Sequence, residues 1–514
     1  MNLVPCARPE PSARALPSPP ALLVVLAVAL SVVLGLAGPA RANVSQLTIL
    51  QDDGALLGSA ARQQHSLDQV SALGADTIHS LVSWRSLSPS PAARRRPSVD
   101  LSDPASYSGW DRYDGLVRGA QARGLHLILS PASPIPRWAS HCAGGSVRLL
   151  RTCRPDPTLF AQFVAALGRR YSGSYAPAGS PLPRVARWSI WNEPNQPGWL
   201  SPQFTGRGAH PVPTSPVLYR SLVLAGIGAL HSTGHGSDQV LLGETAPLGR
   251  RLGGPSGRPM EPSTFYRVLL CVDPRGHPLG GRAGRALGCA HPRRLAVTGV
   301  AHHPYTRGGS QPPTARSASQ EITISSIGRL ARILDQAARR GRLPRSLPIY
   351  YTEFGFQTNP PNRLFGVPLN RQATYLDESA WIAYNNPRIA SVAQYELFDD
   401  TRRGQFKTGL RFADGRPKPS LASFPLPIWV VRAGRQVKVF GQLRAPRLRG
   451  AEVQIQSQAR ASGAFVTVNT VSHTGRRGFL LVTLPYRPGR WRLLVRPPGA
   501  TAGLVSRVAQ TAPR

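Results

Sequence analysis

The sequence predicts an α/β protein, in which a (β/α)8 or TIM barrel is followed by a small all-β sandwich. Short apolar runs alternate with amphipathic segments from residue 43 to residue 424, and there are eight such runs. Beyond a Pro-rich stretch, the pattern changes to short alternating strands. A chain of 514 residues is long enough for one large domain and an accessory domain. A doubly wound open sheet is the alternative, but no Gly-rich phosphate loop follows any run.

Residues 1–42 are typical of a secretory signal peptide. Arg8 and Arg14 precede the apolar run "ALLVVLAVALSVVLGLAG", and the small residues Ala40 and Ala42 form an A-x-A site. We expect cleavage after Ala42 and a secreted protein. The apolar run is near the lower length limit for a membrane span, so an uncleaved membrane anchor is the alternative.

The eight apolar runs are predicted to be parallel strands, because they are Leu-rich or β-branched and apolar on both faces. They cover residues 46–50, 77–84, 126–130, 187–191, 239–243, 295–303, 347–353 and 391–398. The segments between them repeat apolar residues every three or four positions, as amphipathic helices do, and several end in glycine. The predicted helices are residues 110–124, 157–171, 215–234, 324–341 and 370–386. Strands that alternate with helices in this way favour a barrel with insertions.

Residues 425–514 are predicted to form a β-sandwich accessory domain with a loose tail after Gly499. Five alternating runs follow one another at about ten-residue spacing, which is typical of such a sandwich. Packing against the barrel is the favoured role. Carbohydrate binding is the alternative, and only Trp429 and Trp491 could serve there as sugar platforms.

The cysteines agree with export. Cys6 lies in the predicted leader, which leaves Cys142, Cys153, Cys271 and Cys289. Disulfides between the close pairs 142–153 and 271–289 are the simplest of three connectivities. A zinc site is the alternative, but neither pair has C-x2-C spacing.

The net charge of +37 comes almost entirely from arginine, since the chain has only three lysines. The arginines are scattered, and their densest run, Arg94–Arg96, lies among prolines and serines. We therefore predict no nucleic-acid partner. A basic surface attracted to acidic cell-envelope polymers is the more plausible electrostatic role. The sequence predicts no oligomeric state.

In a (β/α)8 barrel, reactive groups lie at the carboxyl ends of the strands. The fourth predicted strand ends in Asn192 and Glu193, and the seventh ends in Glu353. These two glutamates can converge on one ligand at the barrel mouth. Glycoside hydrolysis needs such a pair, one carboxyl as acid and the other as nucleophile or base. A nearby second carboxylate raises the pKa of a buried acid and keeps it protonated.

Other strand ends carry polar groups to which we assign lesser roles. Glu244 ends the fifth strand and Glu396 lies in the eighth, and both are expected to be structural or peripheral. The sixth strand ends in His302 and His303. Neighbouring residues on a strand point to opposite faces, so these histidines should not share a metal ion. We predict no metal site and no cofactor. A Ser/His/Asp site is excluded because no G-x-S-x-G follows a strand.

Three motifs together give the sequence a family resemblance. "WNEPN" on the fourth strand, "HHPY" on the sixth and "TEFGF" on the seventh resemble glycoside hydrolase clan A, in particular its family 5 cellulase-like and family 39-like branches. The resemblance covers roughly residues 45–424. It implies a retaining enzyme that cleaves β-glycosidic bonds in oligo- or polysaccharides.

By this resemblance, Glu193 matches the general acid/base and Glu353 matches the nucleophile. Asn192 matches the residue that binds the sugar 2-hydroxyl. Tyr305 matches the tyrosine that orients the nucleophile, and His303 matches the histidine two residues before it.

The sequence departs from this family pattern in three places. His79 stands where an arginine that supports the nucleophile is expected, and the third strand lacks the histidine typical of family 5. The eighth strand lacks its tryptophan, for which Tyr395 or Phe398 could substitute.

Three tryptophans, Trp84, Trp138 and Trp199, lie near strand ends and are candidates either for sugar stacking or for the core. Two other functions remain open at this point. One is a non-catalytic glycan-binding or scaffold protein on the same fold, for which His79 leaves room. The other is an envelope protein that contacts acidic polymers through its arginines.

Overall fold

The computed structural model describes residues 42–206, 211–250, 258–402, 406–459, 462–472, 474–475, 477–497, 499 and 503–512. The predicted signal peptide lies outside the described residues except for Ala42, so it stays a prediction. Among the helices of the described part, none is long and apolar enough to span a membrane.

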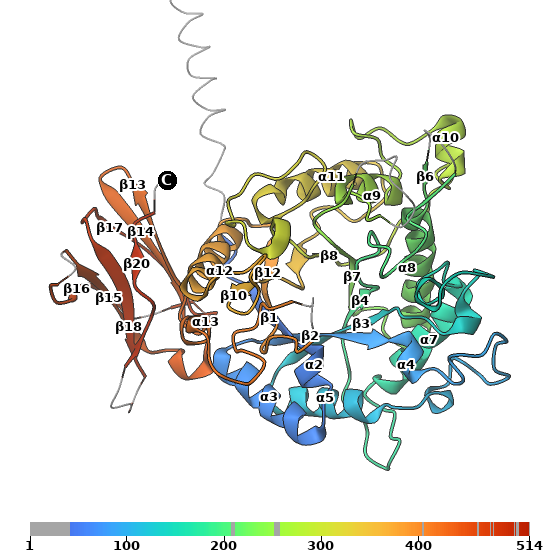
Figure 1. Ribbon diagram of the computed structural model, residues 1–514, viewed down its shortest axis with the longest axis horizontal. Coiled ribbons are helices and arrows are strands. Elements are labelled where there is room, and N and C mark those ends of the chain that lie inside the picture. Colours follow the sequence, from blue (N-terminus) through green and yellow to red (C-terminus); the bar gives the residue numbers. More distant parts are fainter. Residues whose placement is uncertain are drawn as a thin grey trace, which may run out of the picture. The chain divides into compact units, whose positions relative to one another are not determined.

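Eight strands form a closed parallel barrel, which confirms the predicted fold class (Figure 1). Around the barrel the order is β1-β12-β9-β8-β7-β4-β3-β2, and each strand pairs in parallel with its neighbours. The strands are β1 (Leu47–Gln51), β2 (Thr77–Ser83), β3 (His126–Ala132), β4 (Arg187–Ile190), β7 (Gln239–Thr245), β8 (Gly299–His302), β9 (Ile349–Tyr351) and β12 (Ile389–Tyr395). All eight match apolar runs in the sequence.

Residues just before β1 are fixed to the residues that precede the last barrel strand and to the start of that strand. The backbone N–H of Asn43 donates to the carbonyl of Tyr384 at 3.0 Å. The side-chain amide of Asn43 donates to the carbonyl of Ile389 at 2.7 Å. Gln46 is buried, and its side chain donates to the carbonyls of Ala383 at 2.8 Å and Ile389 at 2.9 Å. These bonds hold β1 against β12.

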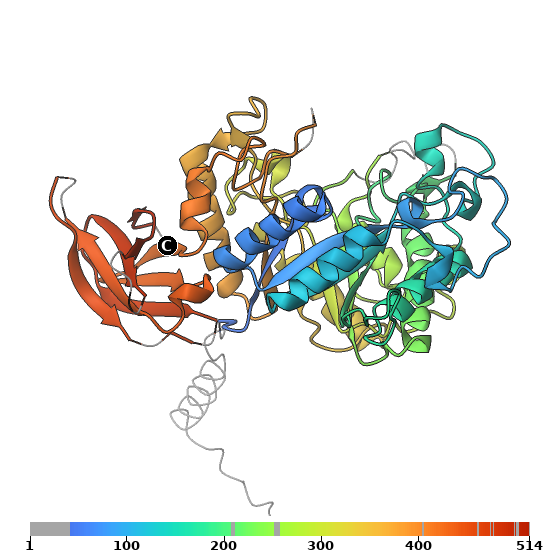
Figure 2. The same ribbon diagram turned by 90° about the horizontal axis from the view of Figure 1, so that it is seen from below.

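The helices surround the barrel, and all five predicted ones are present. They correspond to α5 (Asp111–Ala122), α7 (Pro157–Arg170), α8 (Ser215–Ser232), α11 (Gly328–Arg339) and α12 (Leu369–Tyr384). The remaining helices are α2 (Asp53–Leu56), α3 (Ala60–Leu73), α4 (Trp84–Leu87), α6 (Val147–Leu150), α9 (Pro262–Leu269), α10 (Gly281–Ala286) and α13 (Pro419–Ser423). Figure 2 shows α3 and α5, in blue and cyan, lying side by side on the outside of the barrel.

Helix α3 was not predicted, although its ends carry ordinary capping signals. The Ser59 side chain accepts from the backbone N–H of Arg62, and Gly74 ends the helix at a φ of +87°. A side chain at Gly74 would also collide with the backbone of Arg444, so this position requires glycine for two reasons.

Two disulfides, with the predicted pairing, cross-link loop insertions of the barrel domain. Cys142 is bonded to Cys153, and Cys271 is bonded to Cys289. Short two-stranded sheets lie in further loops, formed by β5 (Phe204–Thr205) with β6 (Val212–Pro213), and by β10 (Thr358–Asn359) with β11 (Val367–Pro368).

After the barrel, the chain forms two antiparallel sheets around a second hydrophobic core, as predicted for a β domain. One sheet has the order β13-β14-β17, and the other has the order β16-β15-β18-β19, with β20 also on β18. Their strands are β13 (Ile428–Ala433), β14 (Gln436–Gln442), β15 (Glu452–Gln458), β16 (Val466–Val471), β17 (Phe479–Pro485), β18 (Arg490–Arg496), β19 (Leu504–Val505) and β20 (Ala509–Gln510).

Two expectations for this region need correction. Residues 503–512, expected to be part of a loose tail, contribute β19 and β20, which both pair with β18. Trp491 has no exposed surface and lies in the core of the domain, so it is not available as a sugar platform.

Candidate active site

Four neighbouring strands of the barrel bring four ionisable side chains to the same end. Glu193 follows β4, Glu244 lies near the end of β7, His303 follows β8 and Glu353 follows β9. In the barrel order these strands are adjacent, so their carboxyl ends form one continuous arc. The arrangement matches the position that (β/α)8 enzymes use for catalysis.

The two predicted catalytic glutamates lie close together and share a histidine. One carboxylate oxygen of Glu193, one of Glu353 and one ring nitrogen of His303 all lie within 4.8 Å of one another. Nδ1 of His303 is 3.0 Å from Oε1 of Glu193 and 3.4 Å from Oε2 of Glu353. The imidazole therefore bridges the pair.

The other side of His303 faces a third carboxylate. Its Nε2 atom is 3.5 Å from Oε2 of Glu244. A neutral imidazole has only one N–H, yet both ring nitrogens of His303 face carboxylate oxygens, so the arrangement suits an imidazolium. Burial lowers the pKa of His303, but Glu353, Glu193 and Glu244 together raise it well above its usual value.

Glu244, which faces His303, also forms a fully buried pair with His79. Oε1 of Glu244 is 2.9 Å from Nε2 of His79 and accepts from the Ser130 hydroxyl at 2.9 Å. The other nitrogen of His79 contacts the side chain of Gln51. Burial alone would raise the pKa of Glu244, but His79 and His303 hold it far below its usual value. Burial opposes the charge on His79, while Glu244 raises the pKa of His79.

The pKa of the Glu353 carboxyl group is raised above its usual value. Burial raises the pKa of Glu353 to about 7, with Glu193 adding to the effect and His303 opposing it. The hydroxyl of Tyr305 donates to Oε2 of Glu353 at 3.4 Å. Near neutral pH, Glu353 is therefore ionised in only part of the molecules, and only the ionised form can act as a nucleophile.

The "WNEPN" segment turns sharply to present Glu193. Trp191 has a φ of +72° and Glu193 a φ of +35°, both in the left-handed region that side chains rarely adopt. Hydrogen bonds hold this conformation. The backbone N–H of Glu193 donates to the carbonyl of Glu244 at 2.9 Å. The Asn195 amide donates to the carbonyls of Ala246 and Met260 at 3.1 and 3.0 Å. Strained backbone of this kind is common at active sites.

Asn192, a predicted sugar-binding residue, has an open hydrogen-bonding position. It is 1% exposed, and its Oδ1 atom has no hydrogen-bond partner among the described residues. A buried amide oxygen without a partner costs free energy, which a ligand hydroxyl would recover.

Aromatic rings border the glutamates on the β8, β9 and β12 side. The ring of Tyr305 stacks on Phe406 at 5.7 Å, and Tyr395 meets Phe406 edge-on at 5.6 Å. Phe406 is 40% exposed, so this ring can meet a ligand. No sequence pattern indicated this residue, because Phe406 lies in a loop between polar residues, away from any strand end.

Two of the three tryptophan candidates are core residues. Trp84 has no exposed surface and packs on Phe160 and Phe163, and Trp138 lies edge-on against it. The structure therefore contradicts sugar stacking by Trp84. Trp138 is 7% exposed, and its indole N–H donates to the carbonyl of Pro89 at 3.1 Å, which also fits a core role. Trp199 is half-buried and stays a candidate.

The structure corrects the expected roles of His79 and Glu244 and leaves that of Glu396 unchanged. His79 was expected to support Glu353, but its direct partner is Glu244. Glu244 was expected to be structural or peripheral, but it lies between His79 and His303. Its position at a strand end was the available signal. Glu396 is buried near Asp52, and burial raises its pKa to about 9, so it is a neutral acid at pH 7.

His302 points away from this arc, as predicted from strand alternation. Its ring nitrogens contact Oγ1 of Thr245 at 2.8 Å and the carbonyl of Ile322 at 2.7 Å. Burial lowers the pKa of His302 to about 3, so its ring is neutral. The group that could offer ligand atoms to a metal ion is instead Glu193, His303 and Glu353. The absence of a metal requirement stays a prediction.

No protein-family model matches the chain, and no curated protein matches it. Solved structures do. The chain is similar to a family 39 glycoside hydrolase from Bacteroides cellulosilyticus, with 13% identity, coverage of 89% of this chain and 82% of that chain, and a TM-score of 0.47. It is similar to a β-glucosidase from Exiguobacterium marinum, with 14% identity, coverage of 71% and 85%, and a TM-score of 0.42. A family 5 glycoside hydrolase from Bacteroides vulgatus has 8% identity, coverage of 86% of each chain and a TM-score of 0.41.

At these identities, activity has to be argued from the site itself.

Proposed function

We propose that this protein is a glycoside hydrolase that cleaves β-glycosidic bonds with retention of configuration. The observation that carries the proposal is the close approach of Glu193 and Glu353, which follow β4 and β9 and each bring a carboxylate oxygen to within 4.8 Å of the other. Retaining enzymes hold their two carboxyl groups about 5–5.5 Å apart, whereas inverting enzymes leave about 6.5–9.5 Å for a water molecule.

In the first step, the Glu353 carboxylate attacks the anomeric carbon while Glu193 gives its proton to the glycosidic oxygen, and the carbon–oxygen bond breaks. In the second step, Glu193 takes a proton from water. The water oxygen bonds to the anomeric carbon, and the bond to Glu353 breaks. The His303 imidazolium stabilises the negative charge that each glutamate carries in turn. Asn192 would bind the sugar 2-hydroxyl through its open Oδ1 atom.

Secretion is part of the proposal. The leader supports it, and so do two disulfides, which persist in oxidising compartments. The substrate class is an oligo- or polysaccharide.

The test is a screen of the mature chain against aryl β-glycosides and against β-glucan, xylan, mannan and galactan. Glu353→Gln should abolish turnover. Glu193→Ala should keep activity only on aryl glycosides with good leaving groups, and azide should restore its turnover. The matched control is Glu452→Gln, an exposed carboxyl on β15, which should behave as wild type. NMR of the first product should show the β-anomer.

Turnover that survives in Glu353→Gln would refute the nucleophile assignment. Binding of a glycan without turnover on any substrate, with folded variants, would support the alternative of a non-catalytic glycan-binding protein.

A further inference from the structure

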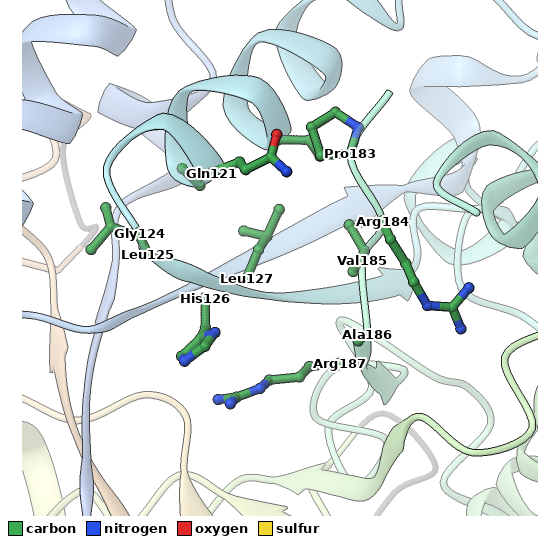
Figure 3. Close-up of a pocket in the computed structure, with 12 residues that line it drawn as sticks. Gln121, Gly124, Leu125, His126, Leu127, Pro183, Arg184, Val185, Ala186 and Arg187 are labelled. Atoms are coloured by element: carbon green, nitrogen blue, oxygen red, sulfur yellow. The ribbon is translucent and has the colours of Figure 1, made fainter. Parts of the chain in front are cut away.

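A cavity of about 290 Å³ lies at the opposite end of the barrel strands from the glutamates (Figure 3). His126 begins β3 and Arg187 begins β4, and both line it, whereas Glu193 follows the other end of β4. The cavity is therefore separate from the candidate active site.

Arg187 is the unusual group in this cavity. Its Nη1 atom is buried and has no hydrogen-bond partner among the described residues. Burial lowers the pKa of Arg187, but a guanidinium still keeps its charge at physiological pH. Arg187 as a whole is half-buried, but a buried N–H without a partner is costly, so an anion in the cavity that accepted from Nη1 would stabilise the protein.

The charge of Asp76 acts on the Arg187 guanidinium, but no described side chain accepts a hydrogen bond from its Nη1 atom. Figure 3 shows the side chains of Arg187 and His126 extending into the same space, and Arg184 extending away from them. Arg184 is satisfied elsewhere, because it donates to the carbonyl of Gly234 at 3.0 Å and to Oδ1 of Asp238 at 2.8 Å. Arg187 thus differs from Arg184 in having no hydrogen bond at Nη1 among the described residues.

A second cavity of about 230 Å³ shares Gly124, Leu125 and His126 with the first. Together the linings contain five arginines and one acidic residue, Asp76. Asp76 is already paired with Arg477 and accepts from the Thr77 hydroxyl at 2.9 Å. Three of these arginines are paired with carboxylates, Arg123 with Asp68, Arg184 with Asp238 and Arg477 with Asp76. Arg187 and Arg449 have no ion pair among the described residues, so the local charge stays positive.

We propose that the cavity beneath β3 and β4 binds a phosphate or carboxylate group, with Arg187 as its main ligand. The planar guanidinium offers paired N–H donors that match two oxygens of such a group. The group can come from free phosphate or from an acidic sugar of a polymer. This site is independent of the proposed glycosidase activity.

The test uses the whole mature chain and calorimetric titration with sodium phosphate, sodium glucuronate and polygalacturonate, each against sodium chloride of equal ionic strength. Saturable binding of phosphate alone supports a free-ion site, and binding of the uronates supports a carboxylate of a polymer. Binding should weaken at least about tenfold in Arg187→Gln, which is the loss of one good charge-assisted contact. The control Arg95→Gln removes an exposed arginine of the same charge and should bind as wild type.

Thermal unfolding separates a ligand site from a structural arginine. Without added anion, Arg187→Gln should unfold at the wild-type temperature or above it, and phosphate should raise the unfolding temperature of the wild type only. Arg187→Met, which keeps the aliphatic stem, replaces the Gln variant if that variant does not fold. Hydrogen exchange of the wild type should show phosphate protecting residues 183–190. Equal effects of phosphate and chloride, or unchanged binding in folded Arg187 variants, would overturn the proposal.

Discussion

His79 and Glu244 form a fully buried pair across the barrel, with Nε2 of His79 2.9 Å from Oε1 of Glu244. His79 lies on β2 and Glu244 on β7, so the contact crosses the interior between strands that are not neighbours. Glu244 also faces His303, and His303 contacts both catalytic candidates, Glu193 and Glu353. The ionisation of these two glutamates therefore depends on the buried residues His79 and Glu244.

The pair should be strongly coupled in stability. His79→Leu and Glu244→Leu each leave a buried charge without its partner, which typically costs about 3–5 kcal/mol. The double variant removes both charges and should lose less than the sum of the two. Urea unfolding of the four proteins measures the coupling. Strict additivity would contradict the pairing.

His303 should control the pH dependence of activity. Its imidazolium lowers the pKa of Glu353, so His303→Gln should raise that pKa above about 7. Because the nucleophile must be ionised, the acidic limb of kcat/KM should move to higher pH by roughly one unit. The measurement is a pH profile of both proteins on an aryl glycoside, with Glu452→Gln as the control. An unshifted limb would contradict the role of His303.

Glu396 should make the protein less stable as pH rises. Burial raises its pKa from 4.5 to about 9 in the folded protein, so the folded state holds this proton more tightly than the unfolded state. The contribution of Glu396 to the free energy of unfolding is then greatest below pH 4.5. It falls between about pH 4.5 and pH 9, by up to about 1.4 kcal/mol per pH unit. Glu396→Gln should remove this loss. Urea unfolding at pH 5 and pH 8 tests it, and the same wild-type–variant difference at both values would argue against it.

Zinc should inhibit the enzyme. The ligand atoms of Glu193, His303 and Glu353 lie within 4.8 Å of one another, and zinc prefers such nitrogen and oxygen donors. Added Zn²⁺ should block turnover, EDTA should restore it, and Mg²⁺, which favours an all-oxygen shell, should have little effect. If EDTA instead inactivates the protein and Zn²⁺ reactivates it, the prediction of a metal-free mechanism is wrong.

The Cys271–Cys289 disulfide should contribute more stability than Cys142–Cys153. The first closes a loop of sequence separation 18 and the second a loop of separation 11. Loops of about 15 residues gain about 3 kcal/mol in the chain-entropy account, and longer loops gain more. Thermal unfolding of the two double Cys→Ser variants compares them. The reverse order would show that native contacts outweigh loop entropy here.

Much of the fold follows from local periodicity, and its omissions have a physical cause. The eight strands are continuous apolar runs because both of their faces are buried. Such runs can be recognised from the local sequence alone. Helix α3 was missed because its inward face includes Gln63 and Ser66, which are buried polar residues. The side chain of Gln63 is satisfied by the carbonyls of Leu56 and Arg112, a tertiary compensation that no periodicity reports.

The candidate site divides in the same way. Glu193 and Glu353 could be found because strand ends converge in any barrel of this type. The role of Glu244 could not be predicted from the sequence, because it depends on contacts with His79 and His303, which are distant in sequence. Trp84 misled because nearness to a strand end does not set the direction of a side chain. It begins α4 and faces α7 rather than the barrel mouth.

The closure of the barrel at Asn43 and Gln46 limits where a leader could be removed. A peptidase that cut after Ala42 would leave every bond from these residues to Tyr384, Ala383 and Ile389 in place. A cut only four residues later would free β12 from the side chains that hold its beginning. Cleavage is therefore compatible with these bonds only within a few residues of Ala42. The new N-terminal residues would themselves take part in the contact between β1 and β12.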